Sequence, residues 1–492
     1  MASLNALRTD AEAWLEELGR ARAEAAPGVP NLAPVDAAHP EVVSPDTARA
    51  VGTLLSSQRV PEPELPRLRL LARFLEDATL AAAAREARQA LEVGRWRSNP
   101  GAGLEASLAE TEVELPLLPE RAPRLQREAG VDRGWEALLS AVQRVQADLA
   151  TGASRLGAES VAAVVLARRD PAWPALETEK FLRVTEDAYR DVLGWALGKV
   201  APRLSPLPRG DASLSDLERV RALPGYPGGL EEADDALRAW ATRLPEAEER
   251  ARHLRTRTVP ALAAAVVPVE IPGQIALLLP AAGEGAHLGP SRFHRTGCAL
   301  HLASVEPEAP VEHRWMGDRT VVSASGWLVR GLLWHERWLR GALGLGRATA
   351  REVARMEGLV ALAALRAEAA LDPHLRTMVA SGPTAGRLGE AAEALSVALH
   401  VRVGRGRALS MVAGLDPSQR ELRAAALASC LWAEADRRFD ADEFRNPSAA
   451  RWLVALWSRG APESAEQMAQ ALCASTLGLD LLASELVVVL GA

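Results

Sequence analysis

Two neighbouring stretches of the sequence decide the fold: VVPVEIPGQIALLLP at Val266–Pro280 and SRFHRTGCALHLA at Ser291–Ala303. The first has two short runs of β-branched and aliphatic residues on either side of a Pro-Gly pair, which is typical of a β-hairpin. In the second, apolar residues recur at the three- and four-residue spacing of an amphipathic helix. The sequence therefore predicts a hairpin at 266–279 and a helix at 292–304.

The remainder of the chain favours α-helices. Ala, Leu, Arg and Glu dominate the composition, and amphipathic segments occur on both sides of the hairpin. The expected helices are 65–93, 132–150, 158–168, 178–197, 214–222, 320–343, 348–370, 384–399, 417–439, 448–457 and 464–472. We therefore predict a mainly α fold.

Composition excludes several function classes. With 64 acidic and 57 basic residues, the net charge of −7 gives no basic footprint for nucleic acid. No run of about 18 uncharged apolar residues is present, so we expect no membrane association. An odd number of widely spaced cysteines (Cys298, Cys430 and Cys473), together with acids in the N-terminal segment where a secretory signal needs bases, indicates a cytoplasmic protein.

The predicted helix after the hairpin carries a histidine pattern. The frame His294–His301 resembles the His-Glu-x-x-His metal helix, followed by Ala-Leu-His, of the thimet-oligopeptidase/oligoendopeptidase (gluzincin) family of zinc metallopeptidases. In such a helix two histidines four residues apart bind zinc and the Glu activates a water molecule. The resemblance puts the first ligand at His294, the general base at Arg295 and the second ligand at Cys298. A guanidinium stays protonated, so Arg295 cannot act as a base.

The resemblance extends beyond this helix. Met316–Leu332 is similar to the helix that carries the family's third ligand, and the ungapped alignment puts Ser323 where the family has Glu. The family also uses a tyrosine hydroxyl near the C-terminus, whereas both tyrosines here, Tyr189 and Tyr226, come earlier. The Phe-x-Asn-Pro sequence at Phe444–Pro447 still resembles the start of the family's final helices.

The resemblance implies a two-lobed, elongated, helical metallopeptidase-like fold, with a small sheet beside the former metal helix and a central cleft. We expect an N-terminal extension at 1–50, a helical lobe at 51–229 and a pseudocatalytic lobe at 230–492. The last contains the degenerate metal helix 292–304 and the third-ligand helix 320–343.

The altered ligand and base positions predict a proteolytically inactive pseudopeptidase that binds no metal or other cofactor. A peptide or protein segment is the expected partner in the cleft, and an active paralogue is one candidate. An edge of the hairpin offers backbone groups to which an extended strand can pair. We select Gln274, His301 and Asp318 as candidate residues of the cleft.

An alternative is an active zinc metallopeptidase or other hydrolase with a non-standard site that includes His294, Cys298 and an unidentified acid. A thiol nucleophile at Cys298 is disfavoured, because helical neighbours rarely give an aligned pair with an orienting acid. The sequence contains no GxGxxG loop, no P-loop and no Gly-x-Ser-x-Gly elbow.

Overall fold

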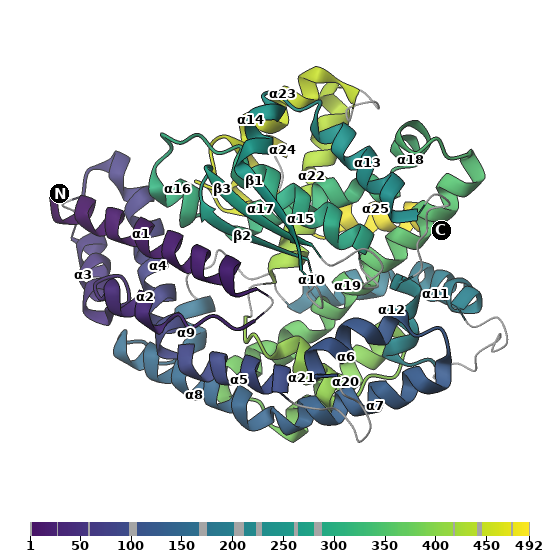
Figure 1. Cartoon of the computed structure of the whole chain (residues 1–492), viewed down its shortest axis with the longest axis horizontal. Coiled ribbons are helices and arrows are strands. Elements are labelled where there is room, and N and C mark those ends of the chain that lie inside the picture. Colours follow the sequence, from purple (N-terminus) through teal and green to yellow (C-terminus); the bar gives the residue numbers. More distant parts are fainter. Residues whose placement is uncertain are drawn as a thin grey trace.

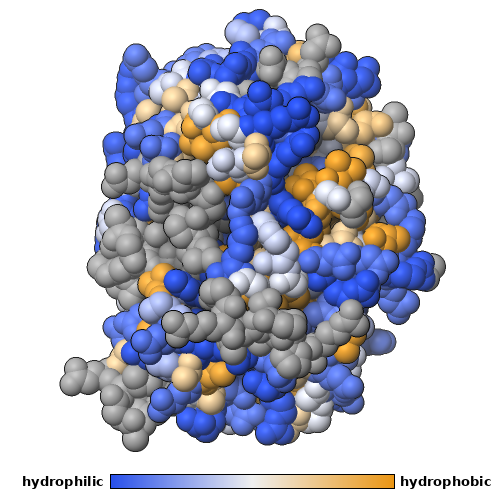
Figure 2. Space-filling view, turned by 90° about the vertical axis from the view of Figure 1, so that its right-hand side faces the viewer, coloured by the Kyte–Doolittle hydropathy of each residue, from blue (hydrophilic) through white to orange (hydrophobic). Residues whose placement is uncertain are grey.

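The described part of the protein is mainly helical and contains a small sheet, as predicted (Figure 1). The computed structural model describes residues 2–26, 28–57, 60–97, 106–166, 175–200, 211–222, 229–259, 264–279, 288–416, 419–439, 445–473 and 476–491. Among the coloured residues of the face drawn in Figure 2, hydrophilic ones predominate and hydrophobic ones lie in separate groups. Within the described ranges, no helix combines the length and apolar character that crossing a bilayer requires.

The part of the chain before the sheet consists of helices. Their bounds are α1 (Ala2–Ala25), α2 (Ala33–Ala38), α3 (Pro45–Ser56), α4 (Leu65–Ala83), α5 (Arg85–Arg97), α6 (Leu108–Glu114), α7 (Arg121–Ala137), α8 (Leu139–Arg155), α9 (Val161–Leu166), α10 (Ala175–Val184), α11 (Glu186–Val200), α12 (Leu214–Ala222), α13 (Gly229–Ala241) and α14 (Ala247–His253). The predicted helix 65–93 is two helices that meet at Ala84. The sequence did not reveal this break, because the apolar periodicity continues across a single-residue interruption.

The sheet has three strands, β1 (Leu254–Thr258), β2 (Ala265–Glu270) and β3 (Gln274–Leu279), in the order β1-β3-β2. β2 and β3 form the predicted antiparallel hairpin, and β1 pairs with β3 in parallel. The sequence did not predict β1, because LRTRT lacks the apolar alternation that marks a half-buried strand.

Helix α1 covers the margin of this sheet. At Gly19 its backbone meets the carbonyl group of Pro268 in β2 so closely that no Cβ atom fits between them. In Figure 1, α1 runs beside β2. Our expectation of an open hairpin edge is therefore wrong at Pro268, and Gln274 lies on the central strand, not at an edge.

The rest of the chain is again helical, with bounds α15 (Leu288–Ala303), α16 (Val311–Trp315), α17 (Arg319–Gly331), α18 (Glu336–Ala342), α19 (Arg347–Ser381), α20 (Ala385–Leu399), α21 (Arg405–Val412), α22 (Arg420–Phe439), α23 (Pro447–Trp457), α24 (Ala465–Cys473) and α25 (Asp480–Leu490). The predicted helix 320–343 is divided by the short 3-10 helix η4 (Leu332–Trp334) into α17 and α18. Helix α19 continues through Pro373, so it is longer than the predicted 348–370.

The hydrophobic core does not divide at the predicted boundaries of 50 and 229. One cluster of buried side chains extends from Leu80 to Leu490 and includes both expected lobes. A second joins α1, α3 and α4 to the sheet, α15 and α16. The first 50 residues are thus part of the packed structure around the sheet.

Candidate functional site

Helices α15 and α17 approach each other closely because each has a glycine at the contact. A Cβ atom at Gly297 would collide with the Ser325 carbonyl group, and one at Gly326 would lie 2.7 Å from the Cys298 sulphur. This approach brings the side chain of His294 on α15 to Ser323 on α17, with 3.3 Å between Nε2 and Oγ. The structure thus joins the first and third positions that the resemblance assigned to ligands.

His294 is buried and has a neighbour at each ring nitrogen. On the Nε2 side, besides Ser323, an oxygen of Glu421 lies 3.4 Å away. On the Nδ1 side, the sulphur of Cys298 lies 3.9 Å away. The indole of Trp327 packs edge-on against the imidazole at a centroid distance of 5.8 Å.

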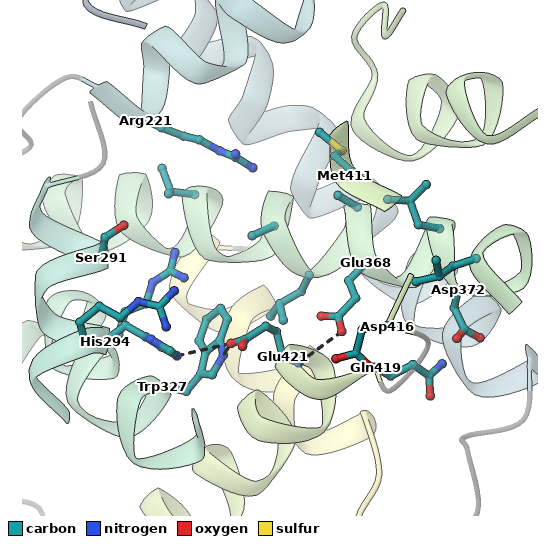
Figure 3. A pocket seen from close by; sticks show the side chains of 18 residues that line it. Arg221, Ser291, His294, Trp327, Glu368, Asp372, Met411, Asp416, Gln419 and Glu421 are labelled. Atoms are coloured by element: carbon teal, nitrogen blue, oxygen red, sulfur yellow. Dashed lines mark hydrogen bonds and ion pairs between the residues drawn. The ribbon is translucent and has the colours of Figure 1, made fainter. Parts of the chain in front are cut away.

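Glu421, in the first turn of α22, is the residue that sequence reasoning missed. Its carboxylate accepts hydrogen bonds from the Ser323 hydroxyl at 3.0 Å and from the Trp327 indole at 2.8 Å. His294, Trp327 and Glu421 lie together in Figure 3. Glu421 is 98 residues from Ser323, and acids are common in the first turn of any helix, so no local signal marks it.

The pair is charged at neutral pH. Burial opposes the charge on the imidazole, but Cys298 and Glu421 together raise the pKa of His294 to about 9. Burial also opposes the charge on the carboxylate, but His294 and Trp327 hold the pKa of Glu421 far below its ordinary value. The histidine is therefore protonated and forms an ion pair with an ionised glutamate.

Glu368 on α19 holds the start of α22 in place. Its carboxyl group accepts the backbone N–H groups of Glu421 at 3.2 Å and of Leu422 at 2.9 Å, so it caps that helix from outside. Burial, and then the charge of Glu421, raise the pKa of Glu368 to about 8. Helix α19 thus fixes the position of the carboxylate that contacts His294.

Arg295, at the position of the general base, extends to the sheet. Its Nε donates a hydrogen bond of 3.1 Å to the carbonyl oxygen of Ala264, the residue before β2. No hydrogen bond joins it to His294 or Glu421.

The three candidate cleft residues lie elsewhere. His301 is buried against Ser325, with 2.8 Å between Nδ1 and Oγ, and burial lowers its pKa to about 4. Asp318 caps α17 and forms an ion pair with Arg423 at 3.1 Å. Together with Gln274 on β3, they are absent from the wall of the cavity that adjoins His294.

The residues at the three ligand positions do not fit the zinc ion that the resemblance implies. Zinc requires three or four converging ligands, usually from Cys, His, Asp or Glu, and Ser323 supplies only a neutral hydroxyl group. Cys298 and Glu421 also lie at opposite nitrogens of the His294 ring, so they do not converge. Within the described residues, no group of three or more His, Cys, Asp or Glu side chains is arranged to hold a metal ion.

A cavity of about 520 Å³ adjoins the pair. Its walls come from α12, α15, α17, α19, α21 and α22, with apolar residues of α19 along one side (Figure 3). The polar residues of the wall are Arg221, Ser291, His294, Arg295, Arg330, Glu368, Asp372, Asp416, Gln419 and Glu421.

No protein-family model matches the sequence, and neither does any curated protein. Solved structures do match the fold. A carboxypeptidase of Pyrococcus furiosus aligns with a TM-score of 0.61 at 12% identity, over 99% of this chain and 98% of its own. A putative oligoendopeptidase F aligns with a TM-score of 0.65 at 14% identity, over 92% of this chain and 84% of its own.

Metallocarboxypeptidase 1 of Trypanosoma cruzi gives a TM-score of 0.61 at 11% identity, over 100% of this chain and 99% of its own. The carboxypeptidases thus match over nearly their whole length, whereas the oligoendopeptidase is longer. Identities this low establish a common fold and nothing finer. The chain shares its fold with carboxypeptidases and oligoendopeptidase F-like peptidases.

Proposed function

We propose that this chain is a proteolytically inactive pseudopeptidase that binds a peptide or protein segment on its metallopeptidase-like scaffold. The observation that carries the proposal is the contact between protonated His294 and ionised Glu421. The nitrogen that would bind a metal instead carries a proton and forms an ion pair with a carboxylate of the same chain.

The positions around this pair support the same conclusion. Arg295 cannot accept a proton from water, and its guanidinium is bound to a backbone carbonyl group. Neutral Ser323 replaces an anionic ligand. No tyrosine follows Tyr226 in the sequence to stabilise an oxyanion.

The geometry disfavours the alternative, a hydrolase built on His294 and Cys298. Glu421 does supply the acid that the sequence left unidentified, on the opposite ring nitrogen from the thiol. The sulphur of Cys298 is nevertheless packed under Gly326, and Cys298 is absent from the cavity wall. A substrate in the cavity has no access to it as a nucleophile.

The cavity supports the binding part of the proposal. Its volume of about 520 Å³ falls in the range of roughly 300–1,000 Å³ that is common for small-ligand sites. A side chain or the end of a peptide fits this space, whereas α1 blocks pairing of an extended strand with β2 at Pro268.

Metal content and peptide cleavage test the proposal. The purified protein should contain less than roughly a tenth of an equivalent of zinc, and quenched peptides and casein should stay intact. Near-stoichiometric zinc that survives dialysis, or chelator-sensitive cleavage that disappears in His294→Ala, would overturn the proposal.

A further inference from the structure

The cavity beside His294 contains two arginines that form no ion pair with an acid of the described residues. Arg221 enters it from α12, as Figure 3 shows, and Arg295 enters from α15. The Nε atom of Arg221 is buried and has no hydrogen-bond partner. Among the described residues, Arg295 makes its one hydrogen bond through Nε, so both Nη groups remain available there.

The acids on the cavity wall are already engaged. Glu421 is bound to His294, and Glu368 accepts two backbone N–H groups. Asp372 pairs with Arg376 at 3.0 Å, and Asp416 pairs with Arg420 at 3.4 Å. None of these four acids has Arg221 or Arg295 as the partner in these contacts.

Glu218, one turn before Arg221 on α12, is also engaged, because it pairs with Arg407. Burial lowers the pKa of Arg221, and the charge of Glu218 only partly offsets this effect. An unpaired guanidinium in such a place destabilises the folded chain unless an anion reaches it from solution.

We propose that Arg221 and Arg295 bind the carboxylate of a small organic anion, whose apolar body lies over the α19 side of the cavity. That side presents Val360, Ala364, Leu365, Leu371 and Leu375. This inference rests on the binding half of the proposed function and names its ligand chemistry.

A carboxylate fits better than a phosphate. The planar Nη edge of a guanidinium can bond two oxygens of either group, so the charge of the anion decides between them. A phosphate dianion loses more hydration energy than a carboxylate monoanion on entering a partly enclosed site, so the carboxylate is favoured.

Matched probes test the proposal by titration calorimetry and thermal unfolding at constant ionic strength. N-acetyl-leucine should bind and raise the Tm, whereas N-acetyl-leucinamide, with the same body and no charge, should do neither. Sodium acetate and inorganic phosphate are the oxyanion-only probes. Equal effects of the acid and the amide, no binding of any probe, or tighter binding of phosphate would each overturn the proposal.

Variants assign the effect to the arginines. In Arg221→Met the affinity for N-acetyl-leucine should fall at least about tenfold, while the ligand-free Tm should rise because a buried unpaired charge is removed. Arg295→Met should also weaken binding. Arg238→Met, an exposed arginine of α13 that pairs with Asp235, is the control and should change neither quantity.

A lower ligand-free Tm with unchanged affinity in Arg221→Met would assign this arginine a purely structural role and overturn the inference. Failure here is distinguishable from failure of the proposed function. Absence of anion binding leaves the zinc and cleavage tests unaffected, and zinc-dependent cleavage would overturn the proposed function whatever the anion result.

Discussion

At His294 a proton occupies the place that the resemblance assigns to a metal. The imidazole is stabilised in its charged form by the carboxylate of Glu421, and this contact closes the Nε2 side of the ring. The same pair makes the stability of the fold depend on pH in a direction that can be calculated.

Because the pKa of His294 is about 9 in the folded chain and 6.5 as the ordinary value, its contribution is complete below pH 6.5 and is lost as the pH rises through 9. Glu421 is partly exposed, so this loss should be about 1–2 kcal/mol. Urea unfolding between pH 6.5 and 10 should show this decline, and His294→Gln should reduce it. His301→Gln is the control, because His301, with a pKa of about 4, is neutral throughout that range. An equal decline in His294→Gln would contradict the assignment.

Restoring the family pattern tests the same residues. Arg295→Glu, Cys298→His and Ser323→Glu together supply two histidines and a glutamate, but Glu421 still holds His294 in its protonated form. Zinc should therefore bind more tightly when Glu421→Gln is added to the triple variant, because metal binding must displace that proton. Competition with a chromophoric chelator measures the difference. A folded quadruple variant without zinc affinity would show that the ungapped alignment is wrong.

At the scale of elements, the pair depends on the approach of α15 to α17 through Gly297 and Gly326. Gly326→Ala puts a methyl group against the Cys298 sulphur and the His294 ring, so the free energy of unfolding should fall by about 1–3 kcal/mol. Gly194→Ala on α11, where the added methyl group meets nothing within 4 Å, should instead stabilise by about 0.5–1 kcal/mol. Chemical denaturation of the two variants makes the comparison. Equal effects would mean that the close approach has no role in the packing.

Local pattern was sufficient for the hairpin and for most helices. β2 and β3 match the predicted 266–279, and α12 matches the predicted 214–222. β1 was missed because its side chains are mostly exposed, so it has no apolar alternation. The break at Ala84 was missed because the apolar periodicity of the sequence is unchanged by an interruption of one residue.

The site could be predicted only in part. His294 and Ser323 were placed together by resemblance, and the structure brings them into contact. The roles of Glu421 and Arg221 in lining the cavity could not be predicted, because contacts between residues far apart in sequence leave no mark on local spacing. The same limit explains why none of the candidates Gln274, His301 and Asp318 lines this cavity.

At the scale of the molecule, α1 determines what the sheet exposes. Arg8 bonds to Glu312 at 2.6 Å, and Glu12 pairs with Arg314 at 2.6 Å, so α1 is bound to α16 while Gly19 contacts β2. Strand edges without such a cover pair with other chains.

Gly19→Val should therefore displace α1 and promote self-association, because the side chain cannot fit against the Pro268 carbonyl group. Light scattering after size-exclusion chromatography measures the oligomeric state. Gly52→Val on α3, where the site is open, is the control and should keep the oligomeric state of the unaltered protein. A monomeric Gly19→Val variant with unchanged Tm would show that the cover is dispensable.

Glu368 gives α19 a second role, because the same helix lines the cavity and holds the N-terminus of α22. A molecule that binds against this helix can shift Glu368, which holds the backbone of Glu421 in place. A shift of Glu421 in turn changes the ion pair between its carboxylate and His294. Occupancy of the cavity should therefore be visible in the ring-proton resonances of His294, a signal from inside the protein that needs no attached label and no turnover.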